Sequence, residues 1–317
     1  MNRVAVVGAG AWGTALALQA ARAGCTVSVW ARDLALLRAT RCSPHLPGYV
    51  LPDAITVLDA LPGAGFDAVL LVVPVQHLRH VVTGWRADAP MVLCCKGIEA
   101  GTGRLPLEIM AALHPGVPSG VLTGPNFAHE VAAGLPAAAV LACADAGLRG
   151  ALAALLASPS FRVYGNADPL GAGLGGAAKN VVAIAAGAVM GAGLGENARA
   201  ALITRGLAEL GRLVLAQGGR AETVAGLSGL GDLLLTCTGG ASRNYTLGLA
   251  LGRGEALADI LASRTGVTEG VATAPALLTR AAGLDLPVCA AVAALLAGET
   301  RLDQAIAALL ARPRRDE

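Results

Sequence analysis

A glycine-rich turn near the N-terminus constrains the fold of this 317-residue chain more than any other stretch. Residues 4–7 are apolar and fit a short buried strand, which the motif Gly8-Ala-Gly-Ala-Trp-Gly13 follows directly. An alanine-rich helical segment then runs to Gly24, and residues 26–30 form a second apolar run. A strand, a glycine turn, a helix and a strand within about thirty residues are typical of a dinucleotide-binding βαβ unit. We therefore predict an α/β fold, a doubly wound and mostly parallel sheet of the Rossmann type.

Each glycine of this turn meets a separate steric need. Gly8 permits the tight turn after the strand, Gly10 lets the backbone approach a pyrophosphate, and Gly13 allows the helix to pack on the strand. The N-terminus of the helix then faces the phosphates, because its first N–H groups have no partner within the helix. The motif therefore predicts cofactor contacts at the turn itself.

The end of the second predicted strand bears on the choice of coenzyme. An acidic residue at this point would hold a ribose 2′-hydroxyl, and an arginine would accommodate a 2′-phosphate. The order here is Trp30-Ala-Arg-Asp33, so both Arg32 and Asp33 are present. We expect NADP(H) to be favoured while NAD(H) remains possible.

Composition narrows the class of protein. With 55% hydrophobic and 15% charged residues, the chain is long enough for about two compact domains. A net charge of +2 gives no basic stripe, which argues against nucleic acid and for a small ligand that is bound locally. The seven cysteines, with Cys94 and Cys95 adjacent, form no disulfide framework. We expect a cytoplasmic protein without a metal.

Two apolar stretches could be mistaken for membrane or export signals. The N-terminal run resembles a secretory signal, but its glycine spacing favours the dinucleotide turn. Residues 181–194 are apolar as well, yet they are interrupted by glycine and too short to cross a bilayer. We therefore expect no membrane insertion.

Further apolar runs predict the rest of the sheet, at residues 67–74, 91–97, 121–123, 137–143 and 161–164. Lys96 ends one of these runs, and the carboxyl ends of parallel strands face the ligand crevice. A surface lysine in a loop is the alternative interpretation. His129 and Glu130 are adjacent, and neighbours on a helix point in different directions, so we interpret them as surface residues.

After residue 176 the strand-like runs give way to helical periods broken by glycine. We predict a dinucleotide-binding domain over residues 1–170 and an all-helical substrate domain over residues 171–317. The segment 181–190 is apolar on all sides, which favours the centre of that domain or a dimer interface.

Lys179 interrupts this apolar segment. It and Lys96 are the two lysines among 24 basic residues, so arginine supplies positive charge everywhere else. Arginine keeps its proton, whereas the pKa of a buried lysine can fall far enough for general acid or base chemistry. A structural lysine that extends its ammonium group to the surface is the alternative.

A second polar group lies further along the chain. Asp232 stands among glycines and leucines, where a buried carboxylate needs a partner, and Lys179 is the candidate. Ser242-Arg243-Asn244 combines a hydroxyl, a guanidinium and an amide, which suit phosphate oxygens. A polar helix start would explain the same tripeptide.

With these residues in hand, the sequence closely resembles the bacterial type of NAD(P)-dependent glycerol-3-phosphate dehydrogenase. The matching motifs follow in order along the chain: Gly8-Ala-Gly-Ala-Trp-Gly-Thr-Ala15, Leu46-Pro-Gly48, Lys96-Gly-Ile98, Gly124-Pro125, Ala128, Glu130, Ala178-Lys-Asn180, residues 197–206, Gly229-Leu-Gly-Asp232, Ser242-Arg-Asn244 and Glu269-Gly270. The resemblance implies a Rossmann domain, a helical domain and a homodimer. It also implies interconversion of dihydroxyacetone phosphate and sn-glycerol 3-phosphate, which feeds phospholipid biosynthesis.

The resemblance also implies roles for individual residues. Lys179 matches the proton-transfer residue, and we assign Asp232 to orient it. Besides the turn glycines, the cofactor positions are Ala11, Trp12, Arg32, His45, Lys96, Ala128, Arg243, Val267 and Glu269. The substrate positions are Lys96, Gly124, Asn126, Lys179, Asp232, Ser242, Arg243 and Asn244. Three residues depart from the common pattern, namely His45 in place of tyrosine and Cys95 and Asn126 in place of serine.

Two other functions fit part of the sequence. A two-domain hydroxy-acid dehydrogenase would share the architecture but act on a carboxylate instead of a phosphate ester. A non-catalytic NAD(P) sensor would keep the first domain, yet it would be expected to lack Lys179 or Asp232, and both are present.

Overall fold

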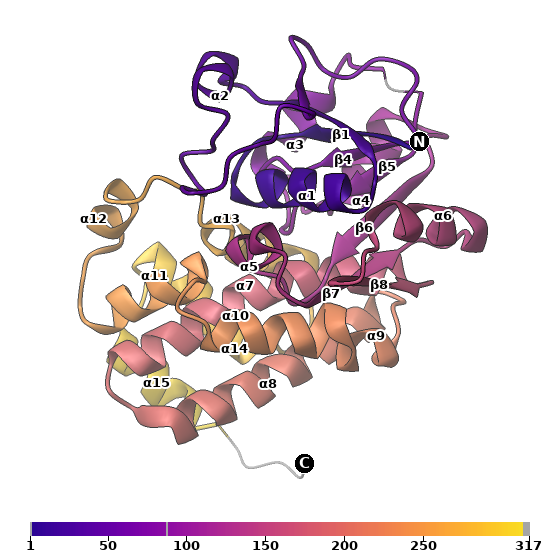
Figure 1. Cartoon of the computed structure of the whole chain (residues 1–317). Coiled ribbons are helices and arrows are strands. Elements are labelled where there is room, and N and C mark those ends of the chain that lie inside the picture. Colours follow the sequence, from indigo (N-terminus) through magenta and orange to yellow (C-terminus); the bar gives the residue numbers. More distant parts are fainter. Residues whose placement is uncertain (1, 87, 313–317) are drawn as a thin grey trace.

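The structure, a computed structural model, describes residues 2–86 and 88–312. It consists of a sheet flanked by helices, followed along the chain by a group of helices (Figure 1). The last strand ends at Asn166, and in the described residues beyond it there are helices and no strands. The predicted order, an α/β Rossmann-type part and then a helical part, is confirmed.

Eight strands form one sheet in the described residues, in the order β3-β2-β1-β4-β5-β6-β7-β8. The strands are β1 (Arg3–Val7), β2 (Thr26–Trp30), β3 (Thr56–Val57), β4 (Ala68–Leu71), β5 (Met91–Leu93), β6 (Ser119–Thr123), β7 (Ala137–Ala142) and β8 (Phe161–Asn166). All neighbouring strands are parallel except β6 and β7, which run antiparallel. The strand order reverses between β1 and β4, and this switch point is where open α/β sheets bind their ligands.

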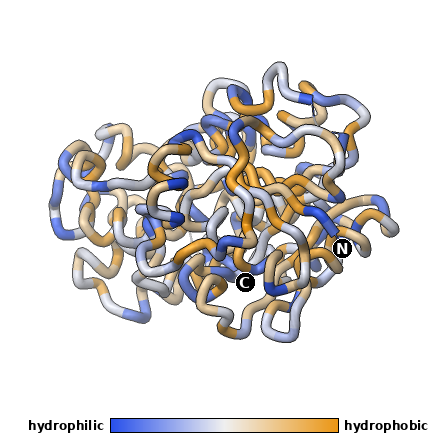
Figure 2. Tube along the Cα trace, turned by 45° about the horizontal axis from the view of Figure 1, so that its top comes forward, coloured by the Kyte–Doolittle hydropathy of each residue, from blue (hydrophilic) through white to orange (hydrophobic). Residues whose placement is uncertain are grey.

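The sheet is buried on both faces. Along β1, Val4 and Val6 belong to one core cluster, whereas Ala5 and Val7 belong to another, as the two-residue period of a strand requires. The helices of this part are α1 (Ala11–Arg22), α2 (Leu34–Thr40), α3 (Val75–Val82), α4 (Pro106–Leu113), α5 (Ala128–Ala133) and α6 (Ala146–Leu156). Helices α1, α5 and α6 contribute to the first cluster, and α3 and α4 contribute to the second. Figure 2 shows hydrophobic residues along the inner strands and hydrophilic ones mainly on outer turns.

The strands differ from the sequence prediction in several of their bounds and at one edge of the sheet. Strand β7 ends at Ala142, one residue before the end of the predicted run, and β8 continues to Asn166, two residues beyond it. The runs at residues 67–74 and 91–97 end as strands at Leu71 and Leu93, so Lys96 lies in the segment after β5 and not at the end of the strand itself. The two-residue edge strand β3 was not predicted, because a pair as short as Thr56–Val57 carries no alternation that a pattern could reveal.

The second part is built around α7, the helix that contains Lys179. The helices are α7 (Pro169–Gly191), α8 (Gly195–Ala216), α9 (Ala221–Ala225), the π-helical turn η1 (Leu227–Gly231), α10 (Asp232–Thr238), α11 (Arg243–Gly252), α12 (Leu257–Ala262), α13 (Glu269–Arg280), α14 (Pro287–Ala297) and α15 (Leu302–Leu310). Helix α7 contacts α8, α10, α11, α13 and α14. The prediction that residues 181–190 lie at the centre of this part is therefore confirmed (Figure 1).

Glycines allow helices α7 and α11 to pack closely against each other. A Cβ added at Gly187 or Gly191 of α7 would lie 2.0 or 2.2 Å from a backbone oxygen of α11. The reverse holds for Gly248 and Gly252 of α11, whose added Cβ atoms would lie 1.9 and 2.3 Å from oxygens of α7. The four-residue spacing places each pair on one helix face, so the two backbones pack directly against each other.

Helix α7 is also long and apolar enough to cross a membrane, judged by length and composition alone. Within the protein, however, 83% of its most apolar 18-residue window is buried. Its apolar surface is therefore covered by the helices around it.

Candidate active site

The glycine turn has the geometry that a dinucleotide needs. Gly8 has φ +112°, which L-residues with a side chain rarely adopt, and a Cβ at Gly13 would stand 1.8 Å from the carbonyl oxygen of Gly8. A Cβ at Gly10, in contrast, would meet no protein atom within 4 Å, so this residue borders open space. Gly8 and Gly13 thus fit the turn itself, while Gly10 leaves room for a ligand.

The start of α1 is also open to an anion. Its N-cap, Gly10, provides no side-chain hydrogen bond, and there is no acidic residue in the first turn. Trp12 in the same turn has a buried Nε1 atom without a hydrogen-bond partner. A buried donor without a partner and the N–H groups of a helix start are both groups that a pyrophosphate and its sugars could satisfy. The residues present therefore fit a dinucleotide.

The remaining cofactor candidates of the first part lie around this turn or on the surface. Ala11 begins α1, and Ala128 begins α5, which packs against α1. Arg32 and His45 are exposed. Asp33 caps α2 by accepting a hydrogen bond from the backbone N–H of Leu36 (3.1 Å). The structure alone does not assign Arg32, Asp33 or His45 to a ligand, and their roles stay predictions.

Lys179, Asp232 and Lys96 form one buried cluster. Lys179 is 7% exposed, and its ammonium group is hydrogen-bonded to Oδ1 of Asp232, which is 1% exposed. The other carboxylate oxygen, Oδ2, accepts a hydrogen bond from Nζ of Lys96 at 2.6 Å. The predicted pairing of Lys179 with Asp232 is confirmed, and Lys96 joins it as a second cation. Three segments more than fifty residues apart thus meet at one carboxylate.

Helix packing brings this carboxylate to Lys179. A Cβ at Gly175 of α7 would lie 2.6 Å from the carbonyl oxygen of Ser228 in η1, and one at Gly229 would lie 2.1 Å from that of Val224. Gly175 therefore lets η1 press against α7, Gly229 lets η1 fold back on α9, and Asp232 begins α10 directly after η1. Single π-helical turns recur at functional sites because they redirect the residues that follow.

The charges of this cluster do not balance. One carboxylate faces two ammonium groups. Burial lowers the pKa of Lys179 from 10.5 to about 8; the charge of Asp232 opposes this shift, and the charge of Lys96 adds to it. Burial on its own would raise the pKa of Asp232, but the two lysines together hold it below its usual value. The cluster therefore combines a permanent carboxylate with an amine that can release its proton near neutral pH.

Two threonines complete the cluster, and the sequence analysis missed both. Thr236 accepts a hydrogen bond from Nζ of Lys179 (3.0 Å) and donates one to the backbone oxygen of Asp232 (2.6 Å). Thr123, at the end of β6, lies with Oγ1 3.4 Å from Oδ2 of Asp232. The four-residue spacing of Asp232 and Thr236 on a helix was a usable signal, because residues at this spacing share one face.

The segment after β6 faces the same cluster. The carbonyl oxygen of Gly124, which has φ +120°, accepts a hydrogen bond from Nζ of Lys96 at 3.1 Å. Asn126 uses its Nδ2 to donate to the backbone oxygen of Ala138 (3.0 Å), whereas its buried Oδ1 has no partner. The side-chain atom left free at Asn126 is thus an acceptor, which suits a hydroxyl better than a phosphate.

Ser242, Arg243 and Asn244 mark the beginning of α11. Ser242 is the N-cap and accepts a hydrogen bond from the N–H of Tyr245 (3.2 Å), so the polar helix start is what the structure shows. The amide of Asn244 is buried between Asn180 and Gly270, to which it is joined by hydrogen bonds of 3.0 and 2.9 Å. Arg243 is exposed and pairs with no carboxylate within the described residues. A phosphate role for these three residues stays a prediction.

Comparison with known proteins identifies the family. The family model described as NAD-dependent glycerol-3-phosphate dehydrogenase N-terminus matches residues 3–148, and the corresponding C-terminus model matches residues 168–307. A protein of Acidiphilium cryptum named glycerol-3-phosphate dehydrogenase [NAD(P)+] is 57% identical, covering 99% of this chain and 98% of the relative. The chain belongs to the NAD(P)-dependent glycerol-3-phosphate dehydrogenase family.

Two further comparisons support this assignment to the family. The protein of the same name from Gluconobacter oxydans is 54% identical over 98% of this chain and 97% of the relative. A crystal structure of glycerol-3-phosphate dehydrogenase from Coxiella burnetii superposes with a TM-score of 0.93 at 37% identity, covering 98% of this chain and 99% of that one. The resemblance seen in the motifs is therefore confirmed over nearly the whole chain.

In this member of the glycerol-3-phosphate dehydrogenase family, two cofactor candidates remain, Val267 and Glu269. Val267 is 43% exposed. Glu269, the first residue of α13, accepts a hydrogen bond through Oε1 from the backbone N–H of Val75 in α3 (3.1 Å). Glu269 therefore connects the helical part with the carboxyl side of β4.

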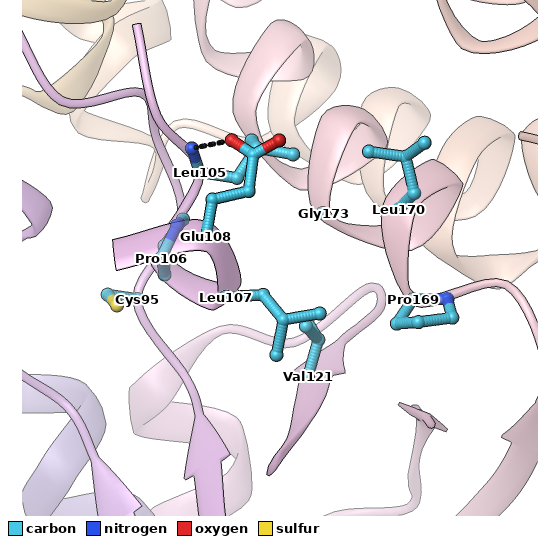
Figure 3. Close-up of a pocket in the computed structure, with 9 residues that line it drawn as sticks. All are labelled: Cys95, Leu105, Pro106, Leu107, Glu108, Val121, Pro169, Leu170 and Gly173. Carbon is cyan, nitrogen blue, oxygen red and sulfur yellow. Dashed lines mark hydrogen bonds between the residues drawn. The ribbon is translucent and has the colours of Figure 1, made fainter. Parts of the chain in front are cut away.

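A small apolar cavity of about 90 Å³ is lined in part by Cys95, which precedes Lys96 in the chain. It is lined by Leu105, the N-cap of α4, by Glu108 of α4, and by Pro169 and Leu170 of α7 (Figure 3). The dashed line in Figure 3 marks the hydrogen bond from the N–H of Leu105 to Glu108. Because neither Lys179 nor Asp232 borders the cavity, we assign it to the packing between α4 and α7 and not to the dehydrogenase site.

Proposed function

We propose that this protein is an oxidoreductase that interconverts dihydroxyacetone phosphate and sn-glycerol 3-phosphate. A hydride passes between NAD(P)H and C2 of the substrate. Family membership supports the activity, and the observation that carries the chemistry is the buried cluster of Lys179, Asp232 and Lys96. The cluster lies beyond the carboxyl ends of the sheet, where β5 and β6 lead into Lys96 and Gly124.

The bound coenzyme supplies the hydride acceptor or donor, and the chain supplies proton transfer and orientation. We assign proton transfer at the C2 oxygen to Lys179, whose pKa of about 8 lets it serve as a base and, once protonated, as an acid. Asp232 holds the amine in place together with Thr236. Lys96 adds a positive charge that favours a developing oxyanion at C2.

The phosphate of the substrate is the second element of this proposal. We assign it to the N-terminus of α11, with the Ser242 hydroxyl, the exposed Arg243 guanidinium and the Asn244 amide around it. The support is that a helix N-terminus attracts anions and that Arg243 has no carboxylate partner among the described residues. Asn126, with its free Oδ1, is then suited to a substrate hydroxyl.

Several finer features belong to the same proposal. We expect NADP(H) to be preferred over NAD(H) because of Arg32, and we expect a homodimer in the cytoplasm that supplies glycerol 3-phosphate for phospholipid synthesis. We place the domain boundary at residue 170, close to the end of β8 and the start of α7. Light scattering of the purified protein tests the dimer.

The assay that tests the function follows NADPH absorbance with dihydroxyacetone phosphate and, separately, with a 2-keto acid. We expect turnover with the phosphate ester and none with the keto acid; the opposite pattern would make the protein a hydroxy-acid dehydrogenase. Binding of NADPH without turnover of either substrate would support the sensor alternative. Repeating the assay with NADH and with Arg32→Ala tests the coenzyme preference, which should weaken in the variant.

A further inference from the structure

Glu269 reaches across from the helical part to the cofactor side of the sheet. Through Oε1 it accepts a hydrogen bond from the N–H of Val75, which follows β4 by four residues. The turn residue Gly8 lies against the same segment, since a Cβ added to it would stand 2.8 Å from the carbonyl oxygen of Val72. Glu269 therefore borders the crevice at the switch point between β1 and β4.

The second carboxyl oxygen of Glu269 lies beside the segment that follows β5. A Cβ added at Gly97, the neighbour of Lys96, would lie 3.3 Å from Oε2 of Glu269 and 3.1 Å from Oγ1 of Thr273. Both of these oxygens are buried, and neither has a hydrogen-bond partner. Glu269 thus contacts two segments on the carboxyl side of the sheet, the one after β4 that borders the glycine turn and the one after β5 that carries Lys96. Ligands of open α/β sheets bind beyond the carboxyl ends of the strands, so a dinucleotide bound at the turn would extend past this carboxyl group.

A buried carboxylate oxygen without a donor is costly, and the neutral acid avoids that cost. Burial raises the pKa of Glu269 to about 7, against the opposing effects of the Val75 N–H and of Arg243 on α11. A further titratable group near it is the thiol of Cys95 after β5, whose own pKa is raised first by burial and then by the charge of Glu269. Small changes in local charge therefore decide whether this carboxyl is ionised near neutral pH.

The coenzyme brings such a change, because its ring is positively charged when oxidised and neutral when reduced. We propose that Glu269 is the group that distinguishes the two forms, remaining ionised beside the oxidised ring and taking up a proton from solvent when the ring is neutral. This inference rests on the proposed function, since it requires a nicotinamide dinucleotide in the crevice. Its consequence is that the relative affinity for the two coenzyme forms depends on pH.

The sign of this dependence follows from linkage. Raising the pH through 7 ionises Glu269, which favours the positively charged ring, so NADP+ should bind more tightly relative to NADPH. At an effective dielectric constant of about 20 to 40, the charge of one ionised carboxyl group near the ring changes the ratio of the Kd values for NADP+ and NADPH by about tenfold or more. Loss of the proton from Lys179 changes the ratio of the Kd values in the same direction, but around pH 8.

The test is the equilibrium binding of NADP+ and of NADPH between pH 6 and pH 8, without substrate. In the wild-type protein the ratio Kd(NADP+)/Kd(NADPH) should fall about tenfold over this range. Glu269→Gln should keep the low-pH ratio up to about pH 7.5, above which the loss of the Lys179 proton still changes it, and Lys179→Met should retain the change below pH 7.5. A Glu269→Gln variant with the wild-type pH dependence, or a wild type with a constant ratio, would overturn the proposal.

The matched control is Glu209→Gln. Glu209 is also a buried carboxyl whose pKa burial raises, and it likewise accepts hydrogen bonds from the start of a helix, here the N–H groups of Val288 and Cys289. It lies in the core of the helical part, so its variant should show the wild-type change in the ratio. Loss of the change in both variants would contradict a specific role for Glu269.

A second measurement uses the wild-type protein and therefore does not require that a variant still binds the coenzyme. Carbon-13 NMR of wild-type protein labelled at the glutamate carboxyl groups reports the ionisation of Glu269 directly. Its apparent pKa should be lower with NADP+ than with NADPH, and an equal value with both would overturn the proposal. If neither coenzyme binds, the proposed function fails; if both bind with a constant ratio, only this inference fails.

Discussion

The glycine turn and the lysine cluster are both parts of the candidate site, but they are built on opposite principles. The turn at Gly8–Gly13 comes from one continuous segment and works because side chains are absent. The cluster around Asp232 draws on β5, β6, α7 and α10, and it works because two lysines and a carboxylate are forced together out of water. Binding of the coenzyme thus depends on local backbone geometry, while proton transfer depends on the tertiary fold.

This difference predicts how each region should fail. A change in the turn should impair coenzyme binding and leave the chemistry of the bound complex largely intact. A change in the cluster should impair turnover and leave coenzyme binding largely intact. Measuring Kd for the coenzyme and kcat separately on each variant therefore tests the comparison.

The largest effect is expected for Lys179→Met. Because general acid and base catalysis contributes about 10²- to 10⁴-fold, kcat should fall by that factor while the Kd for NADPH changes little. Lys179→Arg is the control that keeps the positive charge, and it should lose turnover as well because arginine does not release its proton. Near-normal kcat in either variant would remove Lys179 from the proton-transfer step.

The second-largest effects are expected for alanine substitutions at two glycines of the turn, and the two variants should differ. In Gly13→Ala the new Cβ would overlap the carbonyl oxygen of Gly8, so we expect a loss of about 1–3 kcal/mol in the free energy of unfolding and a large rise in Kd for NADPH. In Gly10→Ala the Cβ meets open space, so stability should be unchanged while Kd still rises. Thermal unfolding measures the stability of both variants, and coenzyme titration measures their Kd for NADPH. An unaffected Kd in Gly10→Ala would show that no phosphate lies beside Gly10.

The pH dependence of kcat should follow the pKa of Lys179, which burial lowers to about 8. Oxidation of glycerol 3-phosphate needs the neutral amine, so its rate should rise about fivefold from pH 7 to pH 8 and less than twofold above that. Reduction of dihydroxyacetone phosphate needs the protonated amine and should fall about fivefold between pH 8 and pH 9. Parallel profiles in the two directions would contradict this assignment.

The smallest effect is expected for Thr236→Val. The variant removes the hydroxyl that accepts a hydrogen bond from Lys179, but the stronger contact with Asp232 remains. We expect a loss of a few-fold in kcat and a lower apparent pKa in the pH profile, because a hydrogen bond to the ammonium form favours its charge. Thr238→Val on the same helix is the control, since the Thr238 hydroxyl donates a hydrogen bond to the backbone oxygen of Leu234 in its own helix.

Much of the fold could be read from the sequence because its signals are local. The turn at Gly8–Gly13 and the apolar runs of β1, β4 and β6 correctly predicted a Rossmann-type sheet. The ends of β4 and β5 were placed too late, because apolar residues continue past the last ladder residue into connections with buried side chains such as Val73 and Cys94. Periodicity reports burial and not hydrogen bonding, so it cannot locate the end of a strand that is buried on both sides.

The sequence by itself determined the class of fold, the coenzyme turn and the suspicion that falls on Lys179, because each depends on residue types at short spacing. Only the tertiary structure decided that Lys96 shares Asp232 with Lys179, that Thr123 and Thr236 complete the cluster, and that Glu269 spans the two parts of the chain. The physical reason is that the pKa of a buried amine depends on desolvation and on neighbouring charges. Those neighbours are brought together by helix packing from segments far apart in the chain.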